Sequence, residues 1–118
     1  MREIMFRAWD KESNKYIYEY QDKQIFEVYG FFSTDRFDYE QYTGLKDNQN
    51  RGIYDGDILE NINPPGMEDC ITSVVWNPIE ACWYVENDDI DIYDPIYNVI
   101  GYCQVIGNIH ETPELLNA

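Results

Sequence analysis

The sequence predicts a mainly β fold in a single domain that spans residues 1–118. Its segments are short, rich in aromatic and β-branched residues, and separated by turn residues about every eight to twelve positions, which is typical of all-β proteins. No segment keeps the period of an amphipathic helix over about three turns. The apolar fraction of 44% is sufficient for a packed core, so we expect a folded chain despite its charge.

The first part of the chain predicts a hairpin, a third strand and a connector. Two apolar runs, Ile4–Trp9 and Tyr16–Tyr20, flank the polar loop Asp10–Lys15, as in a β-hairpin. A third β-like run covers Gln24–Phe32. The following segment, Ser33–Gln41, is polar, and we expect it to be a flexible connector.

Turn residues divide the second half of the chain into further strands. The run Ile58–Ile62 stops at Asn63–Gly66, which combines proline with glycine. The runs Ile71–Trp76 and Cys82–Glu86 enclose the turn Asn77–Ala81 and predict a second hairpin.

Two more elements are expected near the end of the sequence. The stretch Val99–Ile109 predicts the last strand, with a bend or bulge at Gly101 or Gly107, because glycine inside a strand marks such irregularities. The stretch Thr112–Leu116 predicts one helical turn, because a threonine followed by a proline suits the start of a helix.

The glycine-rich stretch Tyr42–Asn61 has the composition of two kinds of ligand-binding loop. A phosphate loop would lead into a helix, whereas these glycines lead into the apolar strand Ile58–Ile62. The residues Asp47–Asn50 followed by Gly52 have the composition of a calcium loop but not its ligand spacing. We therefore expect a turn here rather than a phosphate or calcium site.

Asp55 and Asp57 flank Gly56 and permit two interpretations. They fit a pair of carboxylates for acid–base chemistry, which requires that the environment separate their pKa values. Alternatively, Asp-Gly between apolar runs indicates a tight hairpin turn in which aspartate side chains bond to turn amides. We favour the turn.

The net charge of −15 is unevenly placed. All eight Lys and Arg lie between Arg2 and Arg51, beside ten carboxylates, whereas residues 52–118 hold thirteen carboxylates and no Lys or Arg. Because a nucleic-acid backbone requires a positive footprint, the chain is not expected to bind nucleic acid directly. An acidic surface suits a basic protein partner.

The apolar runs and the cysteines indicate the cellular compartment in which the protein works. No run approaches the ~20 apolar residues of a membrane span, and the charged segment Met1–Asp10 does not fit a signal peptide. Three widely spaced cysteines, Cys70, Cys82 and Cys103, suit small core residues in a reducing environment. We expect a cytoplasmic protein without membrane contact.

Aromatic residues are more numerous than a small core requires. We expect Trp9, Trp76 and Trp83 to build the core, because large rings dominate burial in small β domains. Exposed tyrosine is favoured at protein interfaces, although tyrosines can also cover a core with their hydroxyls in water. The candidate binding residues are Tyr16, Tyr18, Tyr20, Tyr93 and Tyr97.

The acidic run Asn87–Asp94 contains the candidate metal ligands. In a strand, Asp89 and Asp91 would share one face, and hard cations such as calcium or magnesium prefer clustered carboxylates. The same pattern fits an edge strand whose outward charges block pairing with other chains. The candidate ligands are Asp88, Asp89, Asp91 and Asp94.

Cysteine and histidine offer little catalytic chemistry. His110 is the only histidine and no Cys-x-x-Cys is present, which excludes the usual zinc sites. Cys103 and His110 lie seven residues apart in or beside one strand, with nothing to orient them as nucleophile and base. We expect no catalytic residues and no cofactor.

Three blocks of this chain, taken together, resemble the YopX family of small bacteriophage and prophage proteins. They are FRAWDKESNK (Phe6–Lys15), YTGLKDNQNRGIYDGDILE (Tyr42–Glu60) and QVIGNIHETPELL (Gln104–Leu116). The departures are small: Arg51-Gly52 replaces the more usual Gly-Lys, and Glu-Thr-Pro replaces Glu-Asn-Pro. The resemblance implies a domain related to SH3-like barrels in a phage or prophage protein. Together with the elements above, we expect an SH3-like barrel with an N-terminal β-hairpin extension and a short C-terminal helical turn. The resemblance implies no activity.

These observations favour a non-catalytic, acidic protein-binding module that acts on a host or phage protein. A specific form of this hypothesis is that the acidic surface mimics nucleic acid and occupies a DNA-binding protein. Two alternatives come from other classes: a carboxylate-dependent metal site, possibly hydrolytic in chemistry, and a structural protein that assembles into a homo-oligomer.

Overall fold

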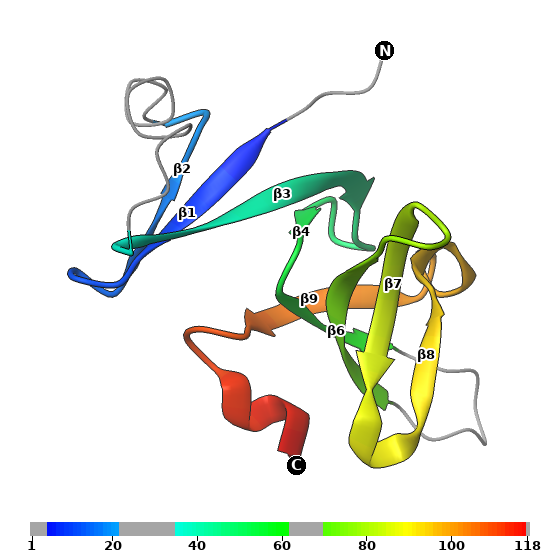
Figure 1. Cartoon of the computed structure of the whole chain (residues 1–118). Helices are drawn as coiled ribbons and strands as arrows, with labels where there is room; N and C mark the ends of the chain where they lie inside the picture. The colour runs from blue at the N-terminus through cyan, green and yellow to red at the C-terminus, as the bar shows by residue number, and fades with distance from the viewer. Residues whose placement is uncertain (1–4, 22–34, 62–69, 118) are drawn as a thin grey trace.

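The computed structural model describes residues 5–21, 35–61 and 70–117, which fold into two antiparallel β-sheets (Figure 1). The first sheet has the strand order β2-β1-β3-β4, and the second has the order β8-β7-β6-β5-β9. The predicted mainly β class is therefore confirmed. The elements are β1 (Phe6–Asp10), β2 (Lys15–Tyr18), β3 (Phe37–Lys46), β4 (Gly52–Tyr54), β5 (Asp57–Asn61), β6 (Cys70–Asn77), β7 (Cys82–Asn87), η1 (Asp88–Ile90), β8 (Ile92–Pro95), η2 (Ile96–Asn98), β9 (Cys103–Asn108) and η3 (Pro113–Asn117).

The predicted N-terminal hairpin forms from β1 and β2, but it is not an extension. Its turn uses Asn14 at a positive φ of 56°, a conformation that asparagine tolerates. Strand β1 pairs with β2 on one side and with β3 on the other, so that Ala8 lies opposite both Ile17 and Tyr39. The hairpin is thus an integral part of the first sheet.

Strand β3 corrects the expectation of a flexible connector over Ser33–Gln41 for residues 37–41; residues 33 and 34 lie outside the described residues. Its ten residues begin at Phe37. The aromatic residues Phe37 and Tyr39 lie opposite Asp10 and Ala8 of β1. Two polar side chains of β3, Asp38 and Glu40, form ion pairs with Lys11 and Arg7, so its polarity does not indicate a loop. The predicted strand Gln24–Phe32 and the predicted stop Asn63–Gly66 lie outside the described residues.

The chain passes from the first sheet to the second between Asp55 and Gly56. The amide of Asp55 donates to Gln41 O in β3, whereas the next amide, of Gly56, donates to Val74 O in β6. Gly56 has the predicted positive φ, 85°. The predicted hairpin is wrong, however, because β4 pairs with β3 while β5 pairs with β6 and β9.

In the second sheet, β5 to β8 form a meander in chain order, and β9 returns to pair with β5. The hairpin β6–β7 is present as predicted, and Asn77 Oδ1 accepts the amides of Ile79 and Glu80 in its turn. Strand β9 pairs with β5 and carries the predicted bulge beside Gly107, since Ile58 lies opposite Gly107 and Leu59 opposite Val105.

The main apolar core lies in the second sheet and takes one residue, Ile53, from β4. Trp83 is 6% exposed within this core, and Trp9 is buried separately at 8%, as expected. The third tryptophan is a correction: Trp76 packs edge-on against Trp83 at 5.0 Å but remains 44% exposed. It lies at the end of β6, where the sheet gives it a neighbour on one side only.

The acidic run is not a strand throughout. Asp88–Ile90 forms the 3-10 helix η1, Asp91 follows in a left-handed conformation, and β8 begins only at Ile92. Asn87 caps this reversal, because its Oδ1 accepts the amide of Asp89. The last described residues form the 3-10 helix η3. None of the helices in the described ranges is long and apolar enough to cross a membrane.

Candidate functional site

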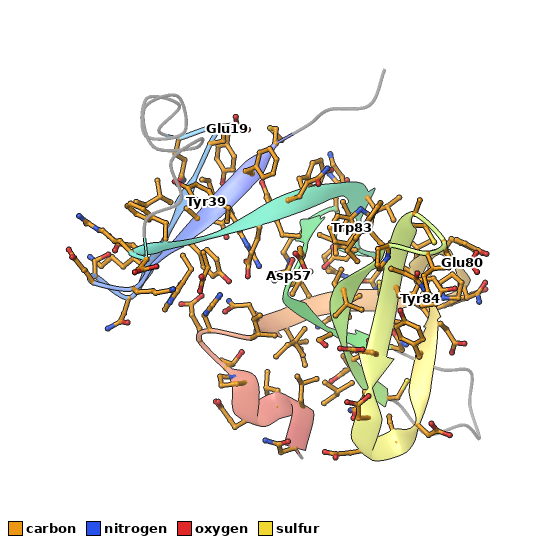
Figure 2. The ribbon with its side chains drawn as sticks, in the orientation of Figure 1. Glu19, Tyr39, Asp57, Glu80, Trp83 and Tyr84 are labelled. Carbon is orange, nitrogen blue, oxygen red and sulfur yellow. The ribbon has the colours of Figure 1, made fainter. Side chains whose placement is uncertain are left out.

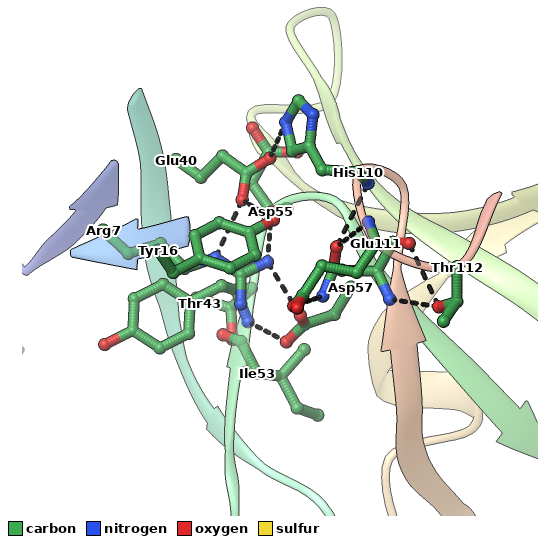
Figure 3. Close-up of polar contacts among 12 residues, drawn as sticks. Arg7, Tyr16, Glu40, Thr43, Ile53, Asp55, Asp57, His110, Glu111 and Thr112 are labelled. Atoms are coloured by element: carbon green, nitrogen blue, oxygen red, sulfur yellow. Dashed lines mark hydrogen bonds and ion pairs between the residues drawn. The ribbon is translucent and has the colours of Figure 1, made fainter. Parts of the chain in front are cut away.

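The junction between the two sheets contains a buried arginine, Arg7, which is 3% exposed. Its Nε lies 2.8 Å from Glu40 Oε1 in the first sheet, and its Nη2 lies 2.8 Å from Asp57 Oδ1 in the second (Figure 3). Nη2 also donates to the carbonyl of Asp55 at 3.3 Å. Asp57 is fixed in turn, since its Oδ2 accepts the amide of Tyr54 at 2.8 Å. One guanidinium therefore joins strands β1, β3 and β5.

Two tyrosine rings enclose this guanidinium. Its Cζ lies 4.1 Å from the ring centroid of Tyr16 and 4.8 Å from that of Tyr54, within the range of cation–π attraction. The hydroxyl of Tyr16 donates to Glu40 Oε1 at 2.9 Å. We call Arg7, Tyr16, Glu40, Tyr54 and Asp57 the Arg7 centre.

The Arg7 centre contains more negative than positive charge. Burial disfavours the charged form of Arg7, but Asp57 and Glu40 outweigh it and raise the arginine pKa. Burial raises the pKa of Asp57 to about 6 although Arg7 acts in the opposite direction. Burial and then Glu40 raise the pKa of Asp55 to about 6 as well. Burial is thus the main reason that Asp55 and Asp57 bind protons more tightly than usual, and the nearby guanidinium only partly offsets it.

His110 closes one side of the Arg7 centre. Its Nε2 lies 3.3 Å from Glu40 Oε2, and its ring stacks on Trp9 at 4.9 Å between centroids and 6° between planes. Asn108 positions it, because the amides of His110 and Glu111 both donate to Asn108 Oδ1. The segment that follows β9 is thereby attached to the first sheet.

A second contact between the sheets is made by Asp47, whose side chain is fully buried. Its Oδ1 accepts the amides of Gln49 and Arg51 at 2.9 and 2.8 Å, and its Oδ2 accepts the amide of Val105 in β9 at 2.8 Å. The loop that has the composition of a calcium loop thus uses its aspartate to hold backbone amides. We call this group the Asp47 contact.

Between the Arg7 centre and the Asp47 contact lies an open cleft of about 870 Å³. Four tyrosine rings follow one another along it, and we call it the tyrosine cleft. The centroids of Tyr20 and Tyr18 are 5.4 Å apart, those of Tyr18 and Tyr54 are 5.5 Å apart, and those of Tyr54 and Tyr42 are 5.3 Å apart. At the Tyr42 end, a Cβ on Gly52 would meet the Tyr42 ring at 3.0 Å, so the ring lies directly on this glycine.

Three basic residues line the tyrosine cleft. Arg7 forms part of its wall, and Lys46 and Arg51 lie at the Tyr42 end, where Lys46 is paired with Gly52 across β3 and β4. Among the described residues that line the cleft, Asp57 is the one carboxylate. Because Glu40 and Asp57 neutralise Arg7, the positive charge of the cleft lies at its Tyr42 end, with Lys46 and Arg51.

A separate groove of about 360 Å³ is lined mainly by apolar side chains. It lies between the end of β3 at Leu45, the hairpin β6–β7 with Trp76 and Trp83, and η2 with Ile96 and Tyr97. Figure 2 shows Trp83 where the two sheets meet, and Glu80 and Tyr84 at the outer side of the second sheet. We call this the apolar groove; it shares no lining residue with the tyrosine cleft.

Comparison with known proteins places the chain in a family. The family model for YopX protein matches residues 5–117. The chain belongs to the YopX family. Among solved structures it is similar to the crystal structure of protein EF1440 from Enterococcus faecalis, with 22% identity, a TM-score of 0.67, and coverage of 98% of this chain and 99% of that one. No curated protein matches the sequence.

In this YopX protein, the three sequence blocks of the resemblance meet at the junction between the sheets. The first block supplies Arg7 and Trp9, the second supplies Asp47 and Asp57, and the third supplies His110. Sequence reasoning did not select Arg7 as a functional residue. The available signal was a single arginine between Phe6 and Ala8 in an apolar strand, since buried cations require partners.

The five candidate binding tyrosines of the YopX chain occupy three places. Tyr16 is a partly buried member of the Arg7 centre, Tyr18 and Tyr20 line the tyrosine cleft, and Tyr97 lines the apolar groove. Tyr93 is 51% exposed and packs on Tyr84 at 4.6 Å between ring centroids. Their role in binding stays a prediction.

The four candidate metal ligands of the YopX chain are distributed over a helix, a turn and a strand. Asp88 and Asp89 belong to η1, Asp91 follows it, and Asp94 belongs to β8. Within residues 5–21, 35–61 and 70–117, no group of three or more His, Cys, Asp or Glu side chains is arranged to hold a metal ion. The metal hypothesis stays a prediction, to be tested by melting the protein with and without magnesium or calcium.

Cys103 and His110 of the YopX chain have separate surroundings. Cys103 is fully buried, and burial, followed by the charge of Asp47, raises its thiol pKa to about 11. A thiol that resists ionisation is a poor nucleophile. His110 lies instead against Glu40 and Trp9.

Proposed function

We propose that this YopX protein is a non-catalytic protein-binding module that contacts a basic partner through the apolar groove. The observation that carries the proposal is the exposure of large apolar side chains at this groove: Trp76 is 44% exposed and Tyr97 is 67% exposed. Ile79, in the turn between β6 and β7, is 92% exposed. Ile79 does not line the groove but lies two positions before Ala81, which does. Large exposed apolar side chains at a groove are characteristic of interaction sites.

The side chains at the groove have the composition of an interface centre. Tryptophan and tyrosine provide large contact areas for little ordering entropy, and they dominate measured binding energies. Trp76 is already oriented by its edge-on contact with Trp83. Binding would therefore require little rearrangement, which favours affinity.

The charge around the groove supports a basic partner. Apart from residues 43–45, the groove is built from the half of the chain that has no Lys or Arg, and Glu80 and Asp94 lie close to its lining residues in sequence. A basic protein is attracted to such a surface, and this attraction weakens as salt screens it. A DNA-binding protein of the host or of a phage has the required charge.

The proposal includes an SH3-like assignment for the second sheet. Strands β5 to β8 form a meander in chain order, and β9 returns to pair with the first of them. Support comes from this return, because it is how small, partly open barrels begin to close.

The test is a tagged capture from host cytoplasm at low and high salt, followed by direct titration of each captured protein after purification. We expect a basic protein that elutes with salt and binds the purified chain. The variant Ile79→Asp and the variant Tyr97→Ala should each weaken its affinity by about tenfold or more, the range of an interface anchor.

The variant Tyr20→Ala is the matched control, because Tyr20 is 65% exposed, as Tyr97 is 67% exposed, but lies in the tyrosine cleft. It should leave the affinity unchanged. A captured protein that binds equally well to the wild type and to the groove variants would refute the apolar groove as the contact surface. A partner whose affinity is insensitive to salt would refute the assignment of a basic partner.

A further inference from the structure

The tyrosine cleft has properties that the proposed protein contact does not use. Its volume of about 870 Å³ falls in the usual size range of small-molecule pockets, roughly 300–1,000 Å³. Both sheets contribute to it, with β1, β3 and β4 on one side and β9 on the other. The Arg7 centre fixes its wall at Tyr54, and the Asp47 contact fixes the loop that carries Arg51, so the cleft is formed before any ligand binds.

The cleft offers cations to an anionic ligand. Arg7 is neutralised by Glu40 and Asp57, so it contributes shape rather than charge. Lys46 is exposed, and the Arg51 side chain is 59% exposed, with its Nε 3.8 Å from Asp47 Oδ2. The Asp47 carboxylate already accepts hydrogen bonds from three backbone amides, so it does not depend on Arg51 as a partner. The guanidinium of Arg51 is therefore well placed for an incoming anion. These two cations lie together at one end of the row of rings.

The other end of the cleft offers aromatic surface. Tyr20 is 65% exposed and lies next to Tyr18, which is partly buried. Burial, followed by the neighbouring Tyr18 and Tyr20, raises the pKa of Tyr54 to about 12, so its phenol is neutral at physiological pH. Neutral tyrosine rings stack on planar bases, and the side-chain amides of Asn50 and Gln104 are available on the cleft wall.

We propose that the tyrosine cleft binds a nucleoside monophosphate, with its phosphate at Lys46 and Arg51 and its base against Tyr18 and Tyr20. A cation pair at one end and aromatic rings at the other match a ligand that has an anionic end and a planar end. A nucleic-acid strand fits less well, because the phosphates that extend beyond the cleft would meet a chain with 23 carboxylates and 8 Lys and Arg residues.

The experiment is isothermal titration of the full chain with the four common ribonucleoside monophosphates, and separately with adenosine, inorganic phosphate and a single-stranded oligonucleotide. At least one monophosphate should bind, and the nucleoside and the phosphate should each bind about tenfold more weakly or less. The substitutions Lys46→Ala, Arg51→Ala and Tyr20→Ala should each weaken binding by about fivefold or more.

Two matched variants serve as controls. Lys15 is an exposed lysine on β2 outside the cleft, and Tyr97 lies in the apolar groove, so Lys15→Ala and Tyr97→Ala should bind the nucleotide as the wild type does. Circular dichroism of each variant verifies that it is folded.

Each contrary outcome overturns the proposal. Equal affinity for inorganic phosphate means an anion site without base stacking, and tighter binding of the oligonucleotide than of any monophosphate means a strand-binding site. If none of the monophosphates gives a heat of binding at about 1 mM, the cleft is not a nucleotide site. The proposed protein contact is unaffected by these results, because the two sites share no residue and each serves as the control for the other.

Discussion

The sequence predicts Asp57 as a turn residue, but its side chain has a second role in the structure. Its Oδ2 accepts a turn amide, as the sequence predicts, but its Oδ1 holds Arg7 across the junction between the sheets. The turn role follows from the Asp-Gly pattern and is therefore predictable. The contact with Arg7 depends on residues 50 positions apart in the chain, which no local pattern encodes. Figure 2 shows Asp57 in this place between the two sheets.

Acidification should stabilise the protein through Asp55 and Asp57. Both carboxyls have folded-state pKa values near 6, above the ordinary value of 3.8, so the folded state binds their protons more tightly than the unfolded state does. Their contribution is fully present below pH 3.8 and is lost as the pH rises through about 6. For the buried Asp57, a shift of about two units corresponds to roughly 3 kcal/mol.

Urea unfolding between pH 7 and pH 4 measures this effect, and the variant Asp57→Asn should reduce the slope of stability against pH. Asp10 acts in the opposite direction at lower pH. Its hydrogen bonds to Arg36 hold its pKa below 3.8, so its contribution is lost only on further acidification. If the Asp57→Asn protein keeps the wild-type slope between pH 4 and pH 7, Asp57 does not titrate in this range.

At the scale of elements, β3 and the turn at Gly56 show why some strands were predictable and others were not. The hairpins β1–β2 and β6–β7 were predictable because both strands and their turn are adjacent in sequence. The strand β3 was not, because its polar residues are satisfied by partners far away, such as Arg7 and Lys11. The residues Asp89–Ile92 alternate between acidic and apolar as in a strand, but Asn87 caps the helical reversal of η1 instead.

Replacement of Gly56 by alanine should destabilise the protein by about 2 kcal/mol or more. Gly56 has a φ of 85°, and a Cβ there would lie 2.7 Å from Glu40 Oε2 and 3.3 Å from Ile109 Cδ1. The Glu40 carboxylate cannot move away without loss of its contact with Arg7. Thermal and urea unfolding measure the loss.

Gly101→Ala is the control for this experiment. A Cβ on Gly101 would meet nothing within 4 Å, and its φ is not in the left-handed region, so this variant should be as stable as the wild type. Equal stability of the two variants would show that the turn at Gly56 is not constrained as described.

At the scale of the whole molecule, the sheets are held by polar contacts at both ends of the tyrosine cleft, with the Arg7 centre at one end and Asp47 at the other. Composition predicted the class of fold and an excess of aromatic surface, and both follow from local patterns. The cleft itself could not be predicted, because its tyrosines come from β3, β4 and the segment around Tyr18–Tyr20. Only the pairing of these strands brings the rings into one row.

Substitution of Asp47 by alanine should destabilise the protein by roughly 2–4 kcal/mol, because three backbone amides lose their acceptor. Hydrogen exchange should locate the damage: the amide of Val105 should lose protection far more than amides in the centre of β6. Asp88→Ala removes an exposed carboxylate of η1 and should change stability by less than about 0.5 kcal/mol. Undiminished protection of Val105 in Asp47→Ala would rule out the Asp47 contact.

The return of β9 to β5 also has a kinetic consequence. The hydrogen bond from Val105 to Asp47 joins residues 58 positions apart, and β9 pairs with a strand that is more than forty residues earlier in the chain. Such closure loses loop entropy before its contacts form, so it slows folding. The hairpins β1–β2 and β6–β7 can form early from neighbouring residues. The rate of folding is then set by the step in which β9 closes, and substitutions in β9 should slow refolding more than equally destabilising substitutions in the hairpin turns.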